Sequence, residues 1–206
     1  FMALVSMREL LDHAAVNGYG IPAFNVNNLE QVQAVMAAAD EVGAPVILQA
    51  SAGARKYAGQ AYIMKLVEAA LDVDASVPVA VHLDHGPSFE MCRDCIDGGF
   101  TSVMIDGSHL PFEENIALTR QVVEYAHPRG VWVEAELGKL AGIEEHVQSD
   151  EHVYTDPDEA VEFVERTGCD SLAIAIGTSH GAYKFKGEAK LDFERLDTIG
   201  KLMPGY

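Results

Sequence analysis

The chain has 206 residues, 49% of them hydrophobic, and carries 32 acidic against 14 basic residues for a net charge of −18. That apolar fraction suffices for one large core, while the acidic balance excludes nucleic acid and anionic membranes as main partners. The lack of a membrane-length apolar run or secretory leader, with an odd number of cysteines (three), indicates reduced thiols and a cytoplasmic protein.

The predicted elements alternate between helix and strand along the chain. The first is an amphipathic N-terminal helix with Leu4, Met7, Leu11 and Ala14 on one face. Six short apolar runs follow, and their continuous character is typical of strands that are covered on both faces. These runs span residues 20–26, 44–51, 77–85, 100–108, 130–138 and 169–181.

Helical periodicity occupies the stretches between these runs. One apolar stripe extends over 29–39 and another over 112–126. The sequence "DPDEA" predicts a third helix, with Asp156 as N-cap and Pro157 at the first helical position. Gly168 is expected to end that helix.

Polar side chains follow every predicted strand, which indicates a barrel with one site at the strand ends. A doubly wound sheet would show a glycine fingerprint after its first strand, and none is present. A (β/α)8 TIM barrel instead collects its active site from all strand ends. The strand-end residues are Asn25, Gln49, Ser51, Asp84, His85, Asp106, Ser108, Glu134, Glu136, Thr178, Ser179 and His180.

Such a barrel needs eight strands and typically about 250 residues, whereas six strands are predicted here. No linker or low-complexity segment divides the chain. We therefore expect residues 1–206 to form a single catalytic α/β barrel domain that holds about the first six strand–helix units and lacks its C-terminal portion.

Two strand-end histidines, His85 and His180, favour a divalent metal, zinc above all, because acids at other strand ends surround them. A lone histidine would more often be a hydrogen-bonding group. Two histidines leave a catalytic zinc site short of ligands, so a third is expected beyond Tyr206. None of the six runs contains a lysine, which argues against a Schiff-base mechanism.

Two loops and one cysteine pair have both a functional and an ordinary interpretation. "GTSHGAYK" with Lys184 is either an anion-binding turn or a solvated loop. The long connection 138–157 is typical of a lid that could deliver Glu144 or Glu145, although both could simply be solvated. Cys92 and Cys95 are expected to be two thiols on a helix rather than a redox pair.

Four segments together resemble the class II, zinc-dependent fructose-1,6-bisphosphate aldolases, a family that also includes tagatose-1,6-bisphosphate aldolases. They are "VHLDHG", "SVMIDGSHLPFEENI", "VEAELGKLAGIEE" and "AIAIGTSHGAYKFKG". Two more, "PAFNVNNLEQVQA" and "QASAGARKYAG", extend the resemblance over essentially the whole chain.

The resemblance implies reversible cleavage of fructose 1,6-bisphosphate to dihydroxyacetone phosphate and glyceraldehyde 3-phosphate through a zinc-stabilised enediolate. It also implies a homo-oligomer, a dimer or tetramer, and a second divalent or monovalent cation. The implied metal residues are His85, His180, Asp106 and Glu136, the last two either positioning ligands or holding the ion in an alternative site.

The resemblance also implies the residues that move protons and bind substrate. Asp84 would be the acid/base at the substrate C4 hydroxyl, and Glu144 on the loop would move the C3 proton. The implied substrate-binding residues are Asn25, Ser51, Gly181 and Lys184.

Two alternatives remain open from the sequence. One is a tagatose-1,6-bisphosphate aldolase of the same family. The other is a truncated, non-catalytic barrel that acts as a binding protein. A metal-independent phosphosugar isomerase is the weakest alternative, because it leaves the histidines and acids without a shared purpose.

Overall fold

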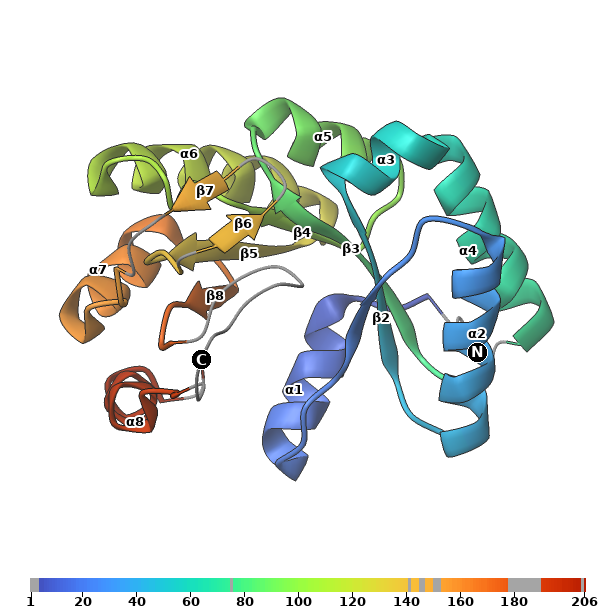
Figure 1. Ribbon diagram of the computed structural model, residues 1–206, viewed down its shortest axis with the longest axis horizontal. Coiled ribbons are helices and arrows are strands. Elements are labelled where there is room, and N and C mark those ends of the chain that lie inside the picture. Colours follow the sequence, from blue (N-terminus) through green and yellow to red (C-terminus); the bar gives the residue numbers. More distant parts are fainter. Residues whose placement is uncertain are drawn as a thin grey trace.

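A computed structural model provides the structure and describes residues 4–74, 76–140, 142–144, 147–149, 153–177, 190–204 and 206. Its main feature is one six-stranded parallel sheet, in which the order of the strands in the sheet is their order along the chain. The strands are β1 (Ala23–Asn25), β2 (Val46–Ser51), β3 (Val79–Gly86), β4 (Ser102–Ile105), β5 (Trp132–Leu137) and β8 (Ser171–Ile174). The sheet curls into a partial (β/α)8 barrel (Figure 1), which confirms the predicted fold class.

Helices follow the strands of the sheet along the chain and form an arc around its outside, as Figure 1 shows. They are α2 (Leu29–Val42), α3 (Ala52–Ala58), α4 (Gln60–Asp74), α5 (Phe89–Asp97), α6 (Phe112–Ala126), a 3-10 turn η1 (His127–Arg129), α7 (Pro157–Thr167) and α8 (Phe193–Leu202). The signals expected for α7 are confirmed: the Asp156 carboxylate accepts from two backbone N–H groups of the first turn, Pro157 begins the helix, and Gly168 ends it with φ 69°.

The main core lies between the sheet and this outer layer of helices. Side chains alternate between the two faces of a strand, and those that point outward are apolar. In β3 these are Val79, Val81 and Leu83, each at most 1% exposed and each part of the same hydrophobic cluster. Burial of this face fixes the register of every strand, and therefore fixes which side chains point inward.

The first helix, α1 (Met7–Asn17), lies on the opposite, inner side of the sheet (Figure 1). Its Met7 and Leu10 pack on Ile47, Ala80 and Trp132 in a second, smaller cluster. Because these strand residues are at or near the start of their strands, α1 covers the amino end of the partial barrel. The carboxyl ends of the strands are not covered by α1 and are therefore available to form a functional site.

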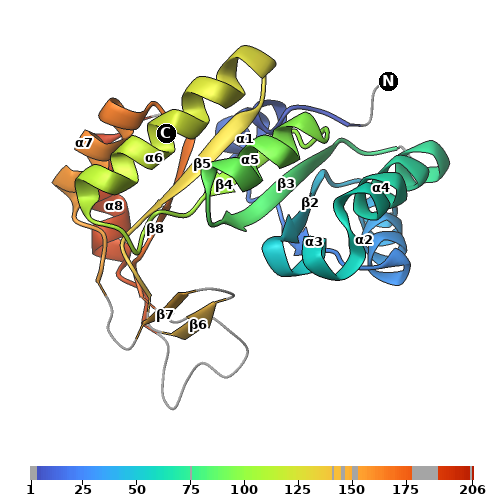
Figure 2. The same ribbon diagram turned by 90° about the horizontal axis from the view of Figure 1, so that it is seen from above.

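The expected lid segment contains a short antiparallel hairpin rather than an unstructured loop. Its strands are β6 (Gly142–Glu144) and β7 (Val147–Ser149). A backbone bridge between Lys139 and Val153 closes its base. Figure 2 shows the hairpin projecting away from the end of β5.

Other predictions can be compared with the described residues. Cys92 and Cys95 are buried free thiols on α5, as expected, and burial raises the pKa of both, that of Cys95 to about 12. Within residues 169–177, the described part of the run 169–181, the strand spans Ser171–Ile174. No helix in the described part of the chain has the length and apolar character needed to cross a membrane.

Candidate metal and substrate site

Asp84 and His85 end β3 and both line the same inner cavity. In a regular strand, neighbouring side chains would point to opposite faces. Here His85 has φ 44° and the β3–β4 register shifts between Leu83 and Gly86. A β-carbon at Gly86 would lie 2.6 Å from the Met104 carbonyl oxygen, so only glycine fits after this irregularity.

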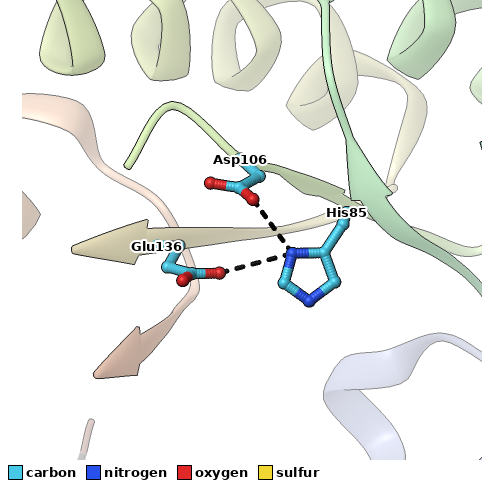
Figure 3. A group of neighbouring side chains, drawn as sticks. All are labelled: His85, Asp106 and Glu136. Atoms are coloured by element: carbon cyan, nitrogen blue, oxygen red, sulfur yellow. Dashed lines mark hydrogen bonds and ion pairs between the residues drawn. The ribbon is translucent and has the colours of Figure 1, made fainter. Parts of the chain in front are cut away.

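His85 lies against two carboxylates from neighbouring strands (Figure 3). Its Nδ1 is 3.0 Å from Asp106 Oδ2, just beyond β4, and 3.4 Å from Glu136 Oε2 on β5. Its Nε2 lies on the other side of the ring, 3.9 Å from Asp84 Oδ1. The two carboxylates therefore orient the ring through Nδ1.

Both carboxylate residues are buried: Asp106 is 6% exposed and Glu136 is 9% exposed. Burial alone would raise the pKa of Asp106, but hydrogen bonds from His85 and from the Ser108 backbone N–H outweigh it and lower the pKa. Asp106 is thus held as a carboxylate that accepts a hydrogen bond from His85.

Asp84 is held by a short chain of amide side chains. Asn25 Nδ2 donates to Asp84 Oδ2 over 2.7 Å, and Gln49 Nε2 donates to Asn25 Oδ1 over 2.7 Å. Ser51 lies beside Asp84 in the β2–β3 register, and its hydroxyl caps α3 by accepting from the Ala54 N–H. The predicted residues Asn25, Ser51, Asp84, His85, Asp106 and Glu136 thus gather at one end of the sheet.

A second polar pair lies one layer deeper, and its interaction was not predicted. His82 is 3% exposed, with Nδ1 2.8 Å from Ser102 Oγ and Nε2 3.5 Å from Glu134 Oε2. Burial, assisted by the charge of His85, lowers the pKa of His82 to about 3. Burial also raises the pKa of Glu134 to about 7, well above the usual value for a glutamate. The signal in the sequence was that His82 shares a strand face with Asp84.

One buried amide beside the site was missed altogether. Asn115 of α6 is 1% exposed and donates from Nδ2 to the backbone carbonyl of Glu136 over 2.9 Å. It belongs to a largely apolar buried stripe of α6 that also includes Thr119, and the sequence gives no sign of its partner at Glu136.

A cavity of about 370 Å³ lies on the inner face of the sheet, and its polar lining residues include Gln49, His82, Asp84, His85, Glu134 and Glu136. Its polar wall comes from the ends of β2, β3 and β5, and its apolar floor includes Met7 and Leu11 of α1. A volume of this size suits a small molecule.

Several predicted residues cannot be compared with this geometry. His180, Gly181 and Lys184 lie outside the described residues. The backbone of Glu144 belongs to β6, and the placement of its side chain is not described.

The donor chemistry of the site fits a divalent cation. Among the described residues, one group of three side chains brings ligand atoms within 4.8 Å of one another: His85, Asp106 and Glu136. An imidazole nitrogen and carboxylate oxygens are zinc ligands. A histidine whose other ring nitrogen bonds a carboxylate is also the usual arrangement at a metal.

Known proteins match this chain over nearly its whole length. A family model described as "Fructose-bisphosphate aldolase class-II" matches residues 5–204. The fructose-bisphosphate aldolase of Staphylococcus aureus (strain Mu50 / ATCC 700699) is 54% identical over 201 residues, which is 97% of this chain and 70% of that protein. The fructose-bisphosphate aldolase of Giardia intestinalis is 53% identical over 203 residues, covering 98% of this chain and 62% of that protein.

Solved structures show the same likeness. The YdjI aldolase from Escherichia coli K12 matches with a TM-score of 0.84 and 39% identity, over 98% of this chain and 70% of that one. A putative fructose-1,6-biphosphate aldolase from Coccidioides immitis matches with a TM-score of 0.85 and 38% identity, over 95% and 69%.

Proposed function

Because the chain belongs to the class-II fructose-bisphosphate aldolase family, we propose that it catalyses the reversible cleavage of fructose 1,6-bisphosphate to dihydroxyacetone phosphate and glyceraldehyde 3-phosphate. The observation that supports this best is the His85–Asp106–Glu136 group, whose two carboxylates are buried, beside Asp84. Asp84, His85 and Glu136 line the inner cavity. A metal-binding group next to a positioned acid is what an aldol cleavage without a Schiff base requires.

We propose that His85 binds zinc through Nε2, because Nδ1 faces Asp106 and Glu136. His180, from the resemblance, would be a second ligand. When bound, zinc would act as a Lewis acid that polarises the substrate carbonyl and stabilises the negative charge developing beside it. Asp106 and Glu136 would keep the imidazole in the orientation and tautomer that zinc requires.

Asp84 would exchange the proton of the substrate C4 hydroxyl. Its carboxylate lines the cavity and lies 3.9 Å from His85 Nε2. The Asn25 amide holds one of its oxygens, so the group has a defined direction. A carboxylate placed this way serves as a general base in cleavage and as a general acid in condensation.

The remaining roles follow from the resemblance. Glu144, with Glu145 as the alternative, would move the C3 proton. Gly181 and Lys184 would bind a substrate phosphate, and Asn25 and Ser51 would contact the sugar. We further propose a cytoplasmic homo-oligomer, dimer or tetramer.

The test is an assay of the purified protein with fructose 1,6-bisphosphate, in which the triose phosphates are detected by coupled oxidation of NADH. We expect activity with zinc, loss with EDTA and recovery when zinc is returned. Absence of triose phosphate in the presence of zinc, or activity indifferent to EDTA, would reject the proposal. The same assay with tagatose 1,6-bisphosphate compares kcat/KM for the two C4 configurations.

A further inference from the structure

Asn115 is a buried polar side chain with no place in the mechanism above. It lies in the first turn of α6 and is 1% exposed. Its Nδ2 donates to the Glu136 carbonyl oxygen over 2.9 Å, while its Oδ1 accepts from the Thr119 hydroxyl over 3.3 Å. Both ends of the amide are therefore engaged, so the orientation of the side chain is defined.

The hydrogen bond from Asn115 to the Glu136 carbonyl lies just beyond the end of the β4–β5 backbone pairing. The β4–β5 pairing ends at Ile105 opposite Ala135, one residue before Glu136. A buried carbonyl without a donor would be costly. Asn115 supplies that donor from a helix, and so fixes the backbone of β5 at the residue that carries the Glu136 carboxylate.

The same amide also packs against the end of β4. A β-carbon at Gly107 would lie 2.3 Å from Asn115 Oδ1 and 2.9 Å from its Cγ. Gly107 is absent from the glycines with positive φ, so space rather than backbone conformation requires glycine there. Gly107 directly follows Asp106, and Asn115 therefore defines the position of that strand end too.

We propose that Asn115 is a positioning residue that sets the spacing of Asp106 and Glu136, and through them the orientation of His85. The two carboxylates meet the same His85 nitrogen, at 3.0 and 3.4 Å. They come from different strands, and the Asn115 amide contacts the backbone of both strand ends. This inference rests on the zinc site of the proposed function.

A purely structural role for Asn115 would give a different result from a positioning role. If the amide only satisfies a buried carbonyl, its loss lowers stability and leaves zinc affinity unchanged. If it sets the two carboxylates, its loss also weakens zinc binding, as removal of partners behind metal ligands commonly does by roughly 10- to 100-fold.

The experiment measures the zinc dissociation constant by competition with a chromophoric chelator at pH 7.5, and Tm of the metal-free proteins. Asn115→Leu keeps the size of the side chain and removes both polar atoms. Gly107→Ala keeps Asn115 but places a methyl group where its Oδ1 lies. The matched control is Thr167→Val, which removes a buried hydroxyl that accepts from the Cys169 N–H at the amino end of β8.

We expect Asn115→Leu and Gly107→Ala to weaken zinc binding about 10-fold, while Thr167→Val lowers Tm with unchanged affinity. Gly107→Ala carries the test if Asn115→Leu does not fold. Zinc affinity within two-fold of wild type in a folded variant at either position would overturn the inference while leaving the proposed function intact. Equal weakening in Thr167→Val would also overturn it, and a wild-type protein that binds no zinc would overturn both.

Discussion

The separate roles that we propose for Asp84 and His85 depend on the irregularity of β3 where they occur. The left-handed backbone at His85 turns its imidazole toward Asp106 and Glu136, while Asp84 still points into the cavity. A strained backbone of this kind costs about 1–3 kcal/mol and persists when its surroundings enforce it. The irregularity thus places the residue that we propose as a metal ligand beside the residue that we propose for proton transfer.

The variant Asp84→Asn separates these two roles. Asparagine has the size of aspartate but cannot take up a proton, so we expect kcat to fall roughly 10²- to 10⁴-fold, the usual contribution of a general acid–base group. Zinc content should stay at the wild-type level, because Asp84 only adjoins the histidine. Steady-state kinetics and metal analysis check this, with His85→Ala as the contrasting variant that should lose zinc. Turnover within ten-fold of wild type would contradict the assignment of Asp84.

His82 makes stability depend on pH. Its pKa falls from 6.5 to about 3 because of burial, so below pH 6.5 the unfolded chain binds a proton that the native protein does not. The contribution of His82 to the free energy of unfolding is therefore complete above pH 6.5 and decreases as the pH falls. At pH 5.5 it is lower by about 1.4 kcal/mol. Glu134 and His85 are the charged neighbours that act on it.

His82→Gln removes this titration. Urea unfolding in EDTA at pH 7.5 and 5.5 should show the stability advantage of wild type over the variant shrinking by about 1.4 kcal/mol at the lower pH. An advantage that is constant over this range would show that His82 has the same pKa in the native and unfolded protein, and would contradict the lowered pKa.

At the scale of elements, Thr155 joins the ends of two strands. It is 1% exposed, its hydroxyl donates to the Leu137 carbonyl at the end of β5, and it accepts from the Ala175 N–H just beyond β8 over 2.8 Å. Arg195, on α8, donates to the Thr155 carbonyl over 2.7 Å. Gly138 has φ 96°, and a β-carbon there would lie 2.6 Å from Thr155 Oγ1. The base of the hairpin segment is therefore closely packed.

Thr155→Val tests this junction. Valine fits the space but leaves the Leu137 carbonyl and the Ala175 N–H without the hydroxyl, so we expect a loss of roughly 3 kcal/mol in the free energy of unfolding. Thr155→Ser keeps the hydroxyl and should lose only about 1 kcal/mol, the value of one buried methyl group. Urea denaturation measures both, and equal losses would show that the methyl group rather than the hydroxyl matters.

At the scale of the whole molecule, local sequence patterns predicted most of the fold but not the buried side-chain hydrogen bonds that support the site. Six strands, the start of α7 at Asp156 and the strand-end residues were predictable, because periodicity, caps and topology are properties of short segments. Asn115 and Thr155 were not, because each bonds a backbone carbonyl 21 or 18 residues away, and no local pattern records such a partner. The Asp84–His85 pair drew attention for the opposite reason: its polarity broke a local rule.

Another contact between residues far apart in the sequence attaches α1 to the strands at the other edge of the sheet. Arg8 Nη2 donates to Asp170 Oδ1 over 2.9 Å across 162 residues, and the guanidinium lies 4.8 Å from the Trp132 ring. Asp170 Oδ2 also accepts from the Val133 N–H and meets His127 Nε2, both at 2.9 Å. Asp170 thus connects α1, the start of β5, η1 and the start of β8, and it holds in place the helix whose Met7 and Leu11 line the cavity.

The two partners of this ion pair should contribute unequally. The Arg8 side chain is 60% exposed, so Arg8→Met should cost at most about 1 kcal/mol, as for other exposed pairs. The Asp170 side chain is 8% exposed, and Asp170→Ala leaves the buried Val133 N–H without its acceptor, so the loss should be roughly 3 kcal/mol. Urea unfolding of the two variants and their double variant measures the coupling. Both variants break the ion pair, but only Asp170→Ala also breaks the hydrogen bond to the Val133 N–H. Similar losses of unfolding free energy in the two single variants would therefore mean that the ion pair contributes most of the stability and the buried hydrogen bond little.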